Sequence, residues 1–332
     1  LSRLTELLAG WQPLWQPAPF MYRQPPWQSA YRELAEMLRQ LSDDEVTRLQ
    51  ADPWQNSPLR AWLPVEELAD LVRLAPLAAE NFSLPPAWGQ HVGGRKWLQI
   101  EAFARHLQVS AKDSLLEWCA GKGHLARALA RCHATEVAAL EWQAPLCAEG
   151  RRLAATQRAA VCMRQQDVMA PDVVRHLSTQ THVVALHACG DLHVRLLELA
   201  VAAGSAVTLA PCCYHRTQEE VYRPVSARGR ALSVEFGLRL NRDDLSLAVQ
   251  ETVTAPRGVR RRREQANAWR LGFDELQREL RGEDRYLPVP SLAYGQLPER
   301  FEDFCRWAAA RKGLALPGGF DLMPFERIGW QR

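Results

Sequence analysis

Between residues 110 and 215, short apolar runs of four or five residues alternate with longer segments of helical spacing. This alternation is typical of a parallel sheet covered by helices and joined by right-handed crossovers. In such sheets the ligand site lies beyond the carboxyl ends of the strands. The sequence therefore predicts an α/β fold over the middle of the chain. We expect its strands at Leu115–Trp118, Glu136–Leu140, Ala160–Met163, His182–Leu186 and Ala206–Leu209.

The two ends of the chain carry a different pattern, with amphipathic helical spacing in place of short apolar runs. Ser42-Asp43-Asp44-Glu45 is a capping box, which predicts the start of a helix. Residues 216–332 are mainly helical in pattern, apart from an expected strand at Leu232–Leu238. The sequence thus indicates a helical N-terminal module at 1–91, an α/β core at 92–240 and a mainly helical C-terminal region at 241–332.

Composition excludes several classes of protein. The chain has 332 residues, 47% of them hydrophobic, and its 41 Lys and Arg against 38 Asp and Glu give a net charge of +3. This balance is that of a folded protein, and it excludes disorder or coiled coil for most of the chain. No apolar run reaches the roughly 20 residues of a membrane helix, so we expect no membrane partner.

The cysteines and the N-terminus bear on location. None of the eight cysteines forms a C-x-x-C pair. We therefore expect reduced thiols and a cytoplasmic protein. The first residues contain no secretory leader. The chain begins with Leu1 and not with Met, from which we expect a trimmed sequence.

Three predicted strands are each followed by an acid. Glu117 ends the first strand, before a turn through Gly121 and Gly123 into a helix. Glu141 ends the second strand, 24 residues later, close to the interval of roughly 20 residues at which such folds place a ribose-binding acid. Asp167 follows the third strand, where a carboxylate can accept an adenine amino hydrogen. A tight structural turn with solvated acids is the alternative, but three acids together favour an adenosine-type ligand.

The sequence of the turn itself limits the classes of ligand that it can bind. It lacks the full G-x-G-x-x-G pattern, and no Ser or Thr follows Lys122 as a P-loop requires. A ligand with ribose and adenine but no phosphates fits best, which points to S-adenosylmethionine. A dehydrogenase remains a rival, only mildly disfavoured by Ala126 at the position of the third glycine, because alanine is allowed there.

The chain resembles the class I S-adenosylmethionine-dependent methyltransferases. Within that class it is similar to a methyltransferase-like family with a D-x-G-x-G-K-G turn, a later H-A-C-G-D/T-L and a C-C-x-H. The corresponding segments here are Glu117–Gly123, His187–Leu192 and Pro211–His215, with Cys119 in place of the first glycine and Glu117 in place of Asp. The resemblance implies a Rossmann-like sheet of seven strands ending in an antiparallel hairpin. No clear hairpin precedes Arg332, although Phe325–Trp330 is a candidate for its first strand.

The turn, the strand ends and the resemblance together give a predicted site. The expected catalytic residues are His187, Asp191 and His215, with a packed strand-end histidine as the alternative for His187. His124 either faces the cofactor in its neutral form or caps its helix. The expected cofactor-binding residues are Glu117, Cys119, Ala120, Gly121, Lys122, Gly123, His124, Glu141, Trp142, Gln166, Asp167 and His187.

His and Cys residues crowd the predicted ends of strands one, four and five, which raises the question of a metal. We expect none, because structural zinc sites usually use C-x-x-C pairs and adjacent cysteines do not easily point at one ion. The thiols are then expected to line an apolar pocket. A metal site and a catalytic thiolate of lowered pKa remain the alternatives. The residues concerned are Cys119, Cys189, Cys212, Cys213 and His215.

A basic run at Arg257–Arg263 holds five arginines in seven positions. A solvated helix face is the usual interpretation, and phosphate contact is the functional one. A similar C-C-H-H element occurs in the eukaryotic tRNA ribose 2′-O-methyltransferases. The sequence therefore favours RNA or a ribonucleoprotein as the methyl acceptor over a small molecule. A cofactor-binding module without transferase activity is a further alternative.

Overall fold

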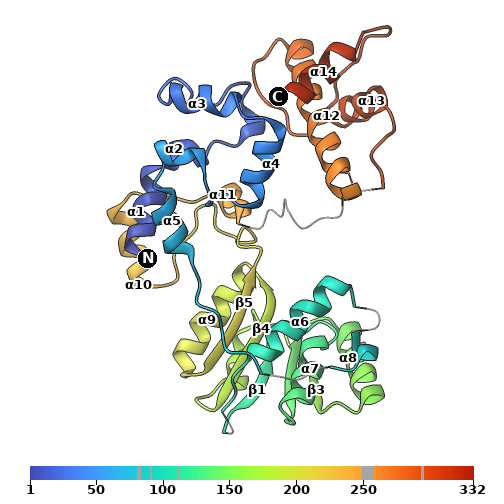
Figure 1. Ribbon diagram of the computed structural model, residues 1–332. Helices are drawn as coiled ribbons and strands as arrows, with labels where there is room; N and C mark the ends of the chain where they lie inside the picture. The colour runs from blue at the N-terminus through green and yellow to red at the C-terminus, as the bar shows by residue number, and fades with distance from the viewer. Residues whose placement is uncertain (81–83, 90–91, 111, 249–256, 293–294) are drawn as a thin grey trace. The chain divides into compact units, whose positions relative to one another are not determined.

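The computed structural model describes residues 1–80, 84–89, 92–110, 112–248, 257–292 and 295–332. The chain divides into two compact units (Figure 1). We call residues 74–250 the α/β unit, and residues 1–73 together with 251–332 the helical unit. Among the described residues, no helix combines the length and the apolar character needed to cross a membrane. The cytoplasmic location stays a prediction.

The α/β unit is built on a parallel sheet in the order β3-β2-β1-β4-β5. Each strand pairs in parallel with its neighbour, and β1 lies between β2 and β4. The order reverses at β1 and β4, so the carboxyl ends of these two strands form the switch point where ligands bind in such sheets. The five strands lie where the sequence predicts them, at Ser114–Glu117 (β1), Val137–Glu141 (β2), Val161–Gln165 (β3), Thr181–Cys189 (β4) and Ala206–Cys212 (β5).

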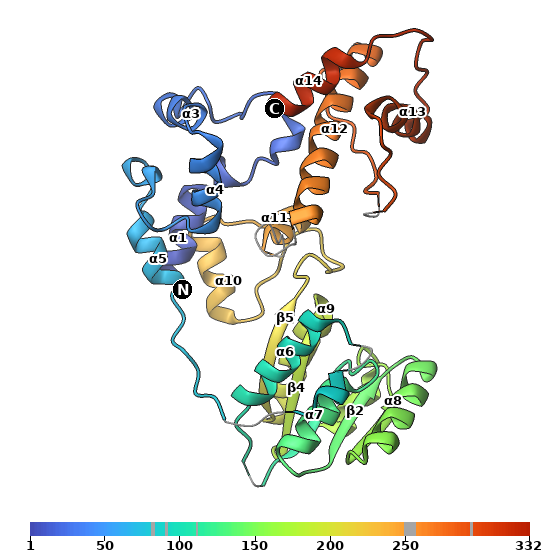
Figure 2. The same ribbon diagram turned by 45° about the vertical axis from the view of Figure 1, so that its right-hand side comes forward.

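Helices cover both faces of this sheet. One core joins α6 and α7 to residues of β1, β2 and β4, and it includes Ile100, Leu115 and Leu129; Figure 2 shows α6 and α7 in front of the strands. The opposite core joins α9 to the sheet through Trp118, Leu140 and Leu196. The helices are α6 (Gly94–His106), α7 (His124–Cys132), α8 (Ala144–Gln157), α9 (Asp191–Ala203), α10 (Ala227–Glu235) and α11 (Arg242–Leu247), with 3-10 turns at Pro86–Gly89 and Pro171–His176.

The segment after β5 differs from the sequence-based expectation. The strand expected at Leu232–Leu238 is wrong, because α10 covers most of this segment and Ser226 caps it by accepting a hydrogen bond from Gly229 N. In the described part of the chain the sheet has five strands, without the seven strands and final hairpin that the resemblance implies. Among the described residues after β5, strand-type pairing is limited to an isolated antiparallel bridge between Val221 and Asn241.

The helical unit combines both ends of the chain. The capping box predicted at Ser42 is confirmed, since its hydroxyl accepts from Glu45 N and the Glu45 carboxylate accepts from Ser42 N. The helices are α1 (Ser2–Gly10), α2 (Gln12–Trp15), α3 (Arg32–Arg39), α4 (Asp43–Ala51), α5 (Val65–Val72), α12 (Arg257–Arg281), α13 (Phe301–Lys312) and α14 (Met323–Gln331), with 3-10 turns at Pro19–Met21 and Pro58–Ala61.

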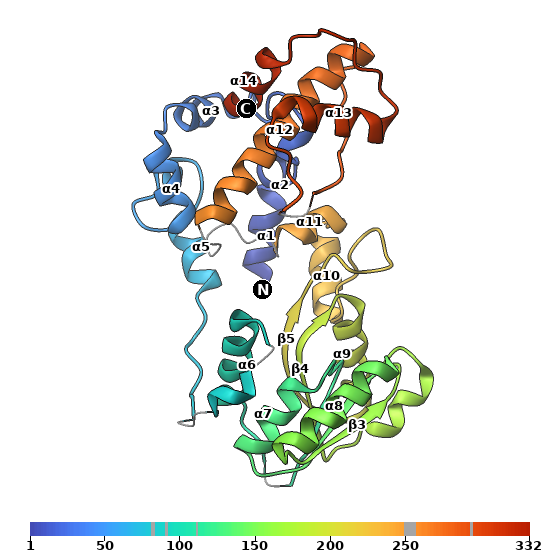
Figure 3. The ribbon, with the colours of Figure 1, turned by 90° about the vertical axis from the view of Figure 1, so that its right-hand side faces the viewer.

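An aromatic core holds α12, α13 and α14 together. Figure 3 shows the course of these three helices. Trp269 and Phe273 of α12 pack against Phe304 of α13, with ring centroids 5.7 and 6.5 Å from that of Phe304. Phe325 joins the same core from α14. The strand expected at Phe325–Trp330 is therefore wrong: this segment is helical, and its apolar side faces α12 and not a sheet.

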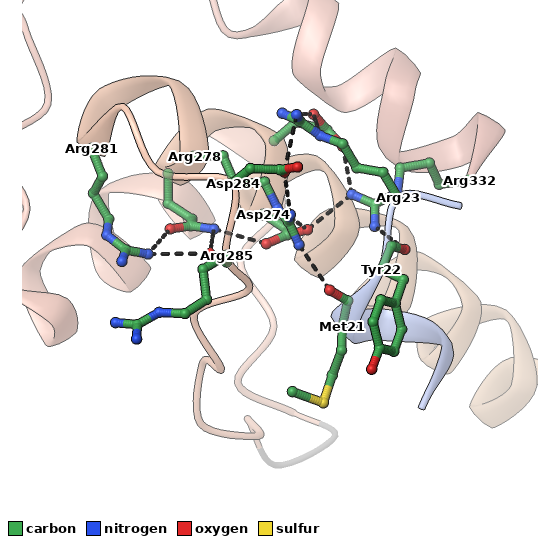
Figure 4. Close-up of polar contacts among 11 residues, drawn as sticks. Met21, Tyr22, Arg23, Asp274, Arg278, Arg281, Asp284, Arg285 and Arg332 are labelled. Carbon is green, nitrogen blue, oxygen red and sulfur yellow. Dashed lines mark hydrogen bonds and ion pairs between the residues drawn. The ribbon is translucent and has the colours of Figure 1, made fainter. Parts of the chain in front are cut away.

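An ionic cluster accompanies this core (Figure 4). The Asp274 side chain is fully buried, and its Oδ2 accepts from Arg278 Nε at 3.0 Å and from Arg332 Nη1 at 2.9 Å. Both cations are also shielded, with side chains 4% and 13% exposed. Asp274 is thus a buried charge with two paired partners, the condition under which a buried carboxylate is tolerated.

The same cluster fastens the N-terminal segment to the C-terminal helices. Arg23 donates to Glu275 of α12, with 2.7 Å between Nη2 and Oε2. Arg332 Nη2 donates to the carbonyl oxygen of Tyr22 at 2.9 Å. Contacts between residues about 250 or 310 positions apart in sequence therefore join the two chain segments of the helical unit.

Candidate active site

The turn after β1 is held in a conformation that favours glycine. Cys119, Gly121 and Gly123 all have positive φ, at 57°, 57° and 64°. A Cβ at Gly123 would lie 2.9 Å from Met163 Sδ, whereas a Cβ at Gly121 would meet nothing within 4 Å. The positive φ is thus the main reason for glycine at 123, because the flexible Met163 side chain could move away, and the space beside Gly121 is open. Cys119 adopts the left-handed conformation at some cost in strain.

Glu117 lies beneath this turn and is 5% exposed. Its Oε2 accepts a hydrogen bond from Ala126 N at 2.9 Å, at the start of α7. Burial raises the pKa of its carboxyl to about 8, against the lowering effect of the Ala126 amide. Glu117 is thus mostly protonated at neutral pH, and it holds the first turn of α7.

Glu141 ends β2 and supports the turn from the other side. Its Oε2 accepts from Gly121 N at 2.9 Å and its Oε1 accepts from Gln143 N at 3.0 Å. The side chain is largely buried, with 6% of the residue exposed. A carboxylate with fixed orientation therefore stands at the carboxyl end of β2, where the sequence predicts the ribose-binding acid.

A pocket of about 380 Å³ opens over the ends of the strands beside this carboxylate. Asp167 is exposed at its rim, with Oδ1 accepting from Met169 N, and Trp142 is 65% exposed. The Gln166 side-chain amide donates a hydrogen bond through Nε2 to Asp172 Oδ1 at 2.9 Å. The lining residues are Cys119, Leu140, Glu141, Trp142, Gln143, Gln166, Asp167, Val168 and Leu192.

The structure brings together five of the residues that the sequence predicts for cofactor binding: Cys119, Glu141, Trp142, Gln166 and Asp167. Sequence reasoning missed the other four, Leu140, Gln143, Val168 and Leu192. Each is a near neighbour of a predicted residue along the chain, so position beside a motif is the signal that would have found them.

The remaining predicted turn residues lie outside this lining. Ala120 N donates to Leu140 O at 2.8 Å, which joins the turn to β2. Lys122 is exposed. His124 begins α7 and contacts the Arg127 guanidinium through Nδ1. Burial and that guanidinium lower the pKa of His124 to about 4, so its ring is neutral at pH 7.

The three predicted catalytic residues come from β4, α9 and the loop after β5. His187 is exposed, has φ of 67°, and lies with Nε2 2.8 Å from Gln99 Oε1. Asp191 Oδ2 accepts from Gln218 N at 2.8 Å. The His215 Nδ1 atom is buried and finds no hydrogen-bond partner among the residues that the structure describes. No local pattern marks Gln99, because its helix precedes β1 and meets β4 only in the folded chain.

The cysteines of this edge correct one sequence-based argument. Adjacent cysteines are not expected to point easily at one ion, yet the Sγ atoms of Cys212, Cys213 and Cys189 lie within 4.8 Å of one another. The physical reason is the left-handed conformation of Cys213, with φ of 50°, which turns the chain at the end of β5. Burial raises the pKa of the Cys119 thiol to about 12 and raises those of Cys189 and Cys212. These shifts oppose the catalytic thiolate alternative.

Comparisons with known proteins bear on the same region. Residues 95–220 match a family model described as a methyltransferase domain. Solved structures similar to this chain include geranyl diphosphate methyltransferase in complex with GPP and sinefungin, at 16% identity, TM-score 0.29, and 42% of this chain against 56% of that one. Coclaurine N-methyltransferase bound to N-methylheliamine and SAH shows 14% identity, TM-score 0.28, and coverage of 63% and 60%. DszA carbon methyltransferase shows 15% identity and a TM-score of 0.29, and the match covers 62% of this chain and 59% of that one.

The chain spans between 56% and 60% of the length of these three proteins. No curated protein matches it. The family match and the parallel sheet confirm the predicted α/β, Rossmann-like fold. The predicted relationship to RNA methyltransferases and the roles of individual site residues stay predictions. The match at residues 95–220 thus agrees with the predicted methyltransferase core, and S-adenosylmethionine is the cofactor that the sequence predicts for it.

Proposed function

We propose that the α/β unit binds S-adenosylmethionine in the pocket over β1, β2 and β3 and transfers its methyl group to an acceptor. The observation that carries this proposal is the meeting of Glu141, Trp142 and Asp167 around one pocket beside the glycine turn. A carboxylate held like that of Glu141 can accept hydrogen bonds from both hydroxyls of a ribose. The pocket volume of about 380 Å³ is within the range of small-molecule sites.

The residues present fit this cofactor. Leu140, Val168 and Leu192 offer apolar surface to an adenine ring, and Trp142 adds an exposed aromatic face. Asp167 at the rim supplies an acceptor for the adenine amino group. The open space beside Gly121 leaves room for the amino-acid part of the ligand close to the backbone.

When bound, S-adenosylmethionine supplies a methyl group that a nucleophile takes by in-line displacement, with the bonding electron pair returning to sulfur. The protein's contribution is to align the two partners, which supplies much of the rate enhancement in such reactions. A base is needed only if the acceptor atom carries a proton that must leave.

We propose His187 as that base. Partial desolvation of the ring, then the charges of Lys96 and Arg95, lowers the pKa of His187, so the ring is neutral at pH 7. The amide oxygen of Gln99 only accepts hydrogen bonds, so His187 Nε2 carries the ring proton and Nδ1 is the basic atom. Gln99 is then a positioning residue that sets the tautomer. Asp191 and His215 stay the alternative bases.

Calorimetric titration with S-adenosylmethionine and S-adenosylhomocysteine tests the cofactor site. Glu141→Ala is expected to weaken binding about 5- to 150-fold, because losing a buried hydrogen-bonding partner costs about 1–3 kcal/mol. Glu141→Gln keeps one acceptor for the turn and is expected to lose less. Glu136→Ala is the matched control, since Glu136 is exposed just before the opposite end of the same strand.

Two results would overturn this assignment. One is a folded wild-type protein that binds neither molecule. The other is a preference for NAD over S-adenosylmethionine, which would support the dehydrogenase alternative. If the cofactor binds but no acceptor yields S-adenosylhomocysteine, the protein is a cofactor-binding module and the transferase proposal fails.

For the acceptor, we propose RNA, supported by the arginine run at the start of α12. Arg261 and Arg262 are exposed there, and Arg260 and Arg263 are half-buried, while the side chain of Arg257 lies outside the described residues. Clustered arginines on one helix suit phosphate contacts. The ribonucleoprotein and small-molecule alternatives are outcomes of the test.

Transfer of labelled methyl groups to fractionated cell extract separates these acceptors. Label that ribonuclease renders soluble supports RNA, whereas label in a ribonuclease-resistant small molecule contradicts it. Arg260→Gln with Arg261→Gln is expected to weaken RNA binding and to lower its salt dependence. Arg306→Gln, an exposed arginine of α13 in the same unit, is the control.

A further inference from the structure

Three thiols meet at the carboxyl ends of β4 and β5. Cys189 ends β4, Cys212 ends β5 and Cys213 follows it. Their Sγ atoms all lie within 4.8 Å of one another, and those of Cys189 and Cys212 are 3.3 Å apart. All three residues are half-buried. None of them lines the pocket assigned to the cofactor, so the cluster is a separate feature of the α/β unit.

Backbone conformation produces this convergence. Cys189 and Cys212 are register partners across β4 and β5, beyond an irregularity that begins at Leu186. In an extended strand Cys212 and Cys213 would point to opposite faces. The left-handed φ of 50° at Cys213 ends that alternation and directs the second thiol toward the first. A non-glycine residue in this conformation is uncommon and often marks a functional site.

Hydrogen bonds between the two loops fix the thiols in place. Gly190 N donates to Cys212 O at 3.1 Å, and Asp191 N donates to Arg216 O at 3.1 Å. Arg216 N in turn donates to Cys213 O at 2.9 Å. Gly190 is necessary for this closeness, because a Cβ there would lie 1.8 Å from Arg216 O. These backbone contacts therefore bring the three thiols together.

The geometry suits a soft divalent ion. Zinc binds thiolate sulfur at about 2.3 Å in tetrahedral geometry, which separates two sulfur ligands by about 3.8 Å. The sulfur positions here, from 3.3 Å to at most 4.8 Å apart, bracket that separation. Thiolate ligands select zinc over the hard cations that prefer oxygen.

We propose that Cys189, Cys212 and Cys213 bind one zinc ion. Binding forms three zinc–sulfur bonds and breaks three S–H bonds, and the three protons go to solvent, so no oxidant or reductant is needed. The site has three protein ligands, and its fourth coordination position is open to water or another small ligand. The proposal goes beyond the proposed methyl transfer and stands independently of it.

Metal analysis of the full chain, purified without chelator, tests the site. About one zinc per chain is expected. After removal of zinc, titration with Co²⁺ is expected to give a thiolate-to-cobalt charge-transfer band that saturates at one equivalent. Thiol titration of the native protein adds a second readout, because zinc should protect three thiols that become reactive when a chelator is added.

Single Cys→Ser variants then assign the ligands. Cys189→Ser and Cys213→Ser are each expected to weaken Co²⁺ binding by more than the roughly 10–100-fold that loss of an outer-shell partner costs. Cys162→Ser is the matched control, because Cys162 is also half-buried in the sheet but is not part of the cluster. The proposal is overturned if folded wild-type protein gives no charge-transfer band, if Cys213→Ser binds as the control does, or if Cys189 and Cys212 are joined as a disulfide in the purified protein. The Co²⁺ titration of wild type decides the matter even if a variant fails to fold.

Discussion

At the scale of single residues, the acids of the sheet edge have distinct roles. Glu117 is buried and neutral under the glycine turn, whereas Glu141 presents a fixed carboxylate to the pocket. Both end adjacent strands, and both accept hydrogen bonds from the segment that enters α7. Glu117 accepts one backbone amide hydrogen bond and Glu141 accepts two, and only Glu141 lines the pocket. Glu117 therefore supports the site, and Glu141 is available to a ligand.

This difference predicts a pH dependence of stability. Because the pKa of Glu117 is raised from 4.5 in the unfolded chain to about 8 in the folded one, the folded state holds the proton more tightly. Between these values the folded state binds more protons, so stability falls as pH rises, by at most about 1.4 kcal/mol per pH unit. Chemical denaturation across this window measures it. Glu117→Gln should flatten the profile and the exposed control Glu136→Gln should not; an unchanged slope in Glu117→Gln would refute the assignment.

The sequence could predict which residues gather at this edge, but not all of their states. Spacing placed Glu117, Glu141 and Asp167 at the ends of successive strands, because strand ends follow from apolar periodicity. The neutral state of Glu117 depends on desolvation by surrounding atoms, which no local pattern encodes. The convergence of Cys212 with Cys213 depends on a single φ value, and the sequence alone favoured the opposite outcome.

At the scale of elements, the backbones of α12 and α14 approach each other closely. Gly329 of α14 faces the backbone of α12, where a Cβ would lie 2.1 Å from Ala268 O and 2.6 Å from Gly272 N. Gly272 is equally restricted, because its own Cβ would lie 2.6 Å from Phe325 O. Two glycines thus let two helix backbones approach, and the aromatic core around Trp269 packs beside them.

We therefore expect Gly329→Ala to destabilise the helical unit by about 1–3 kcal/mol, the range for overpacking a close contact. Backbone atoms are what the new methyl group meets, so side-chain adjustment cannot relieve the clash. Gly258→Ala in α12 is the control, because a Cβ there meets nothing within 4 Å and alanine favours the helix. Thermal and denaturant unfolding followed by circular dichroism compare the two. Equal stability of Gly329→Ala and wild type would contradict the close approach.

Whether an element could be predicted from the sequence depends on whether its signal is local. The five strands and the capping box at Ser42 depend on local signals, and they were found. Leu232-Ser233-Val234-Glu235-Phe236 alternates like a strand, yet the Ser226 cap selects a helix. The segment around Phe325 became helical because α12, more than fifty residues earlier, supplies its apolar partner. Such partners are not visible in a local window.

At the scale of the whole molecule, the α/β unit consists of one continuous stretch of chain, whereas the helical unit consists of two stretches. The contact of Arg23 with Glu275, 252 residues apart, belongs to a unit closed by both chain ends. Side chains at such separation leave no periodic signal, so the sequence divided the chain into three consecutive regions. The continuous unit, in contrast, depends on strand and helix patterns that are local.

The continuity of the α/β unit predicts that residues 74–250 fold alone and bind S-adenosylmethionine within a few-fold of the full chain. The N-terminal part of this segment belongs to the core: Leu84 is 5% exposed, Trp88 packs on the same cluster, and Glu80 N donates to Arg105 O at 2.8 Å. At the other end, Asn241 caps α11 through a reciprocal bond with Asp244.

A shorter fragment tests whether residues 74–91 and 241–250 contribute to the stability of the α/β unit. A fragment of residues 92–240, the core expected from sequence, lacks Leu84, Trp88 and α11 with its Asn241 cap. Burying a leucine side chain contributes about 1.5–3 kcal/mol, so this fragment should unfold at clearly lower denaturant concentration. Unfolding curves and cofactor titrations of both fragments beside the full chain measure the difference. If 74–250 fails to fold while the full chain binds the cofactor, the α/β unit depends on the helical unit; if both fragments are equally stable, residues 74–91 contribute nothing to its core.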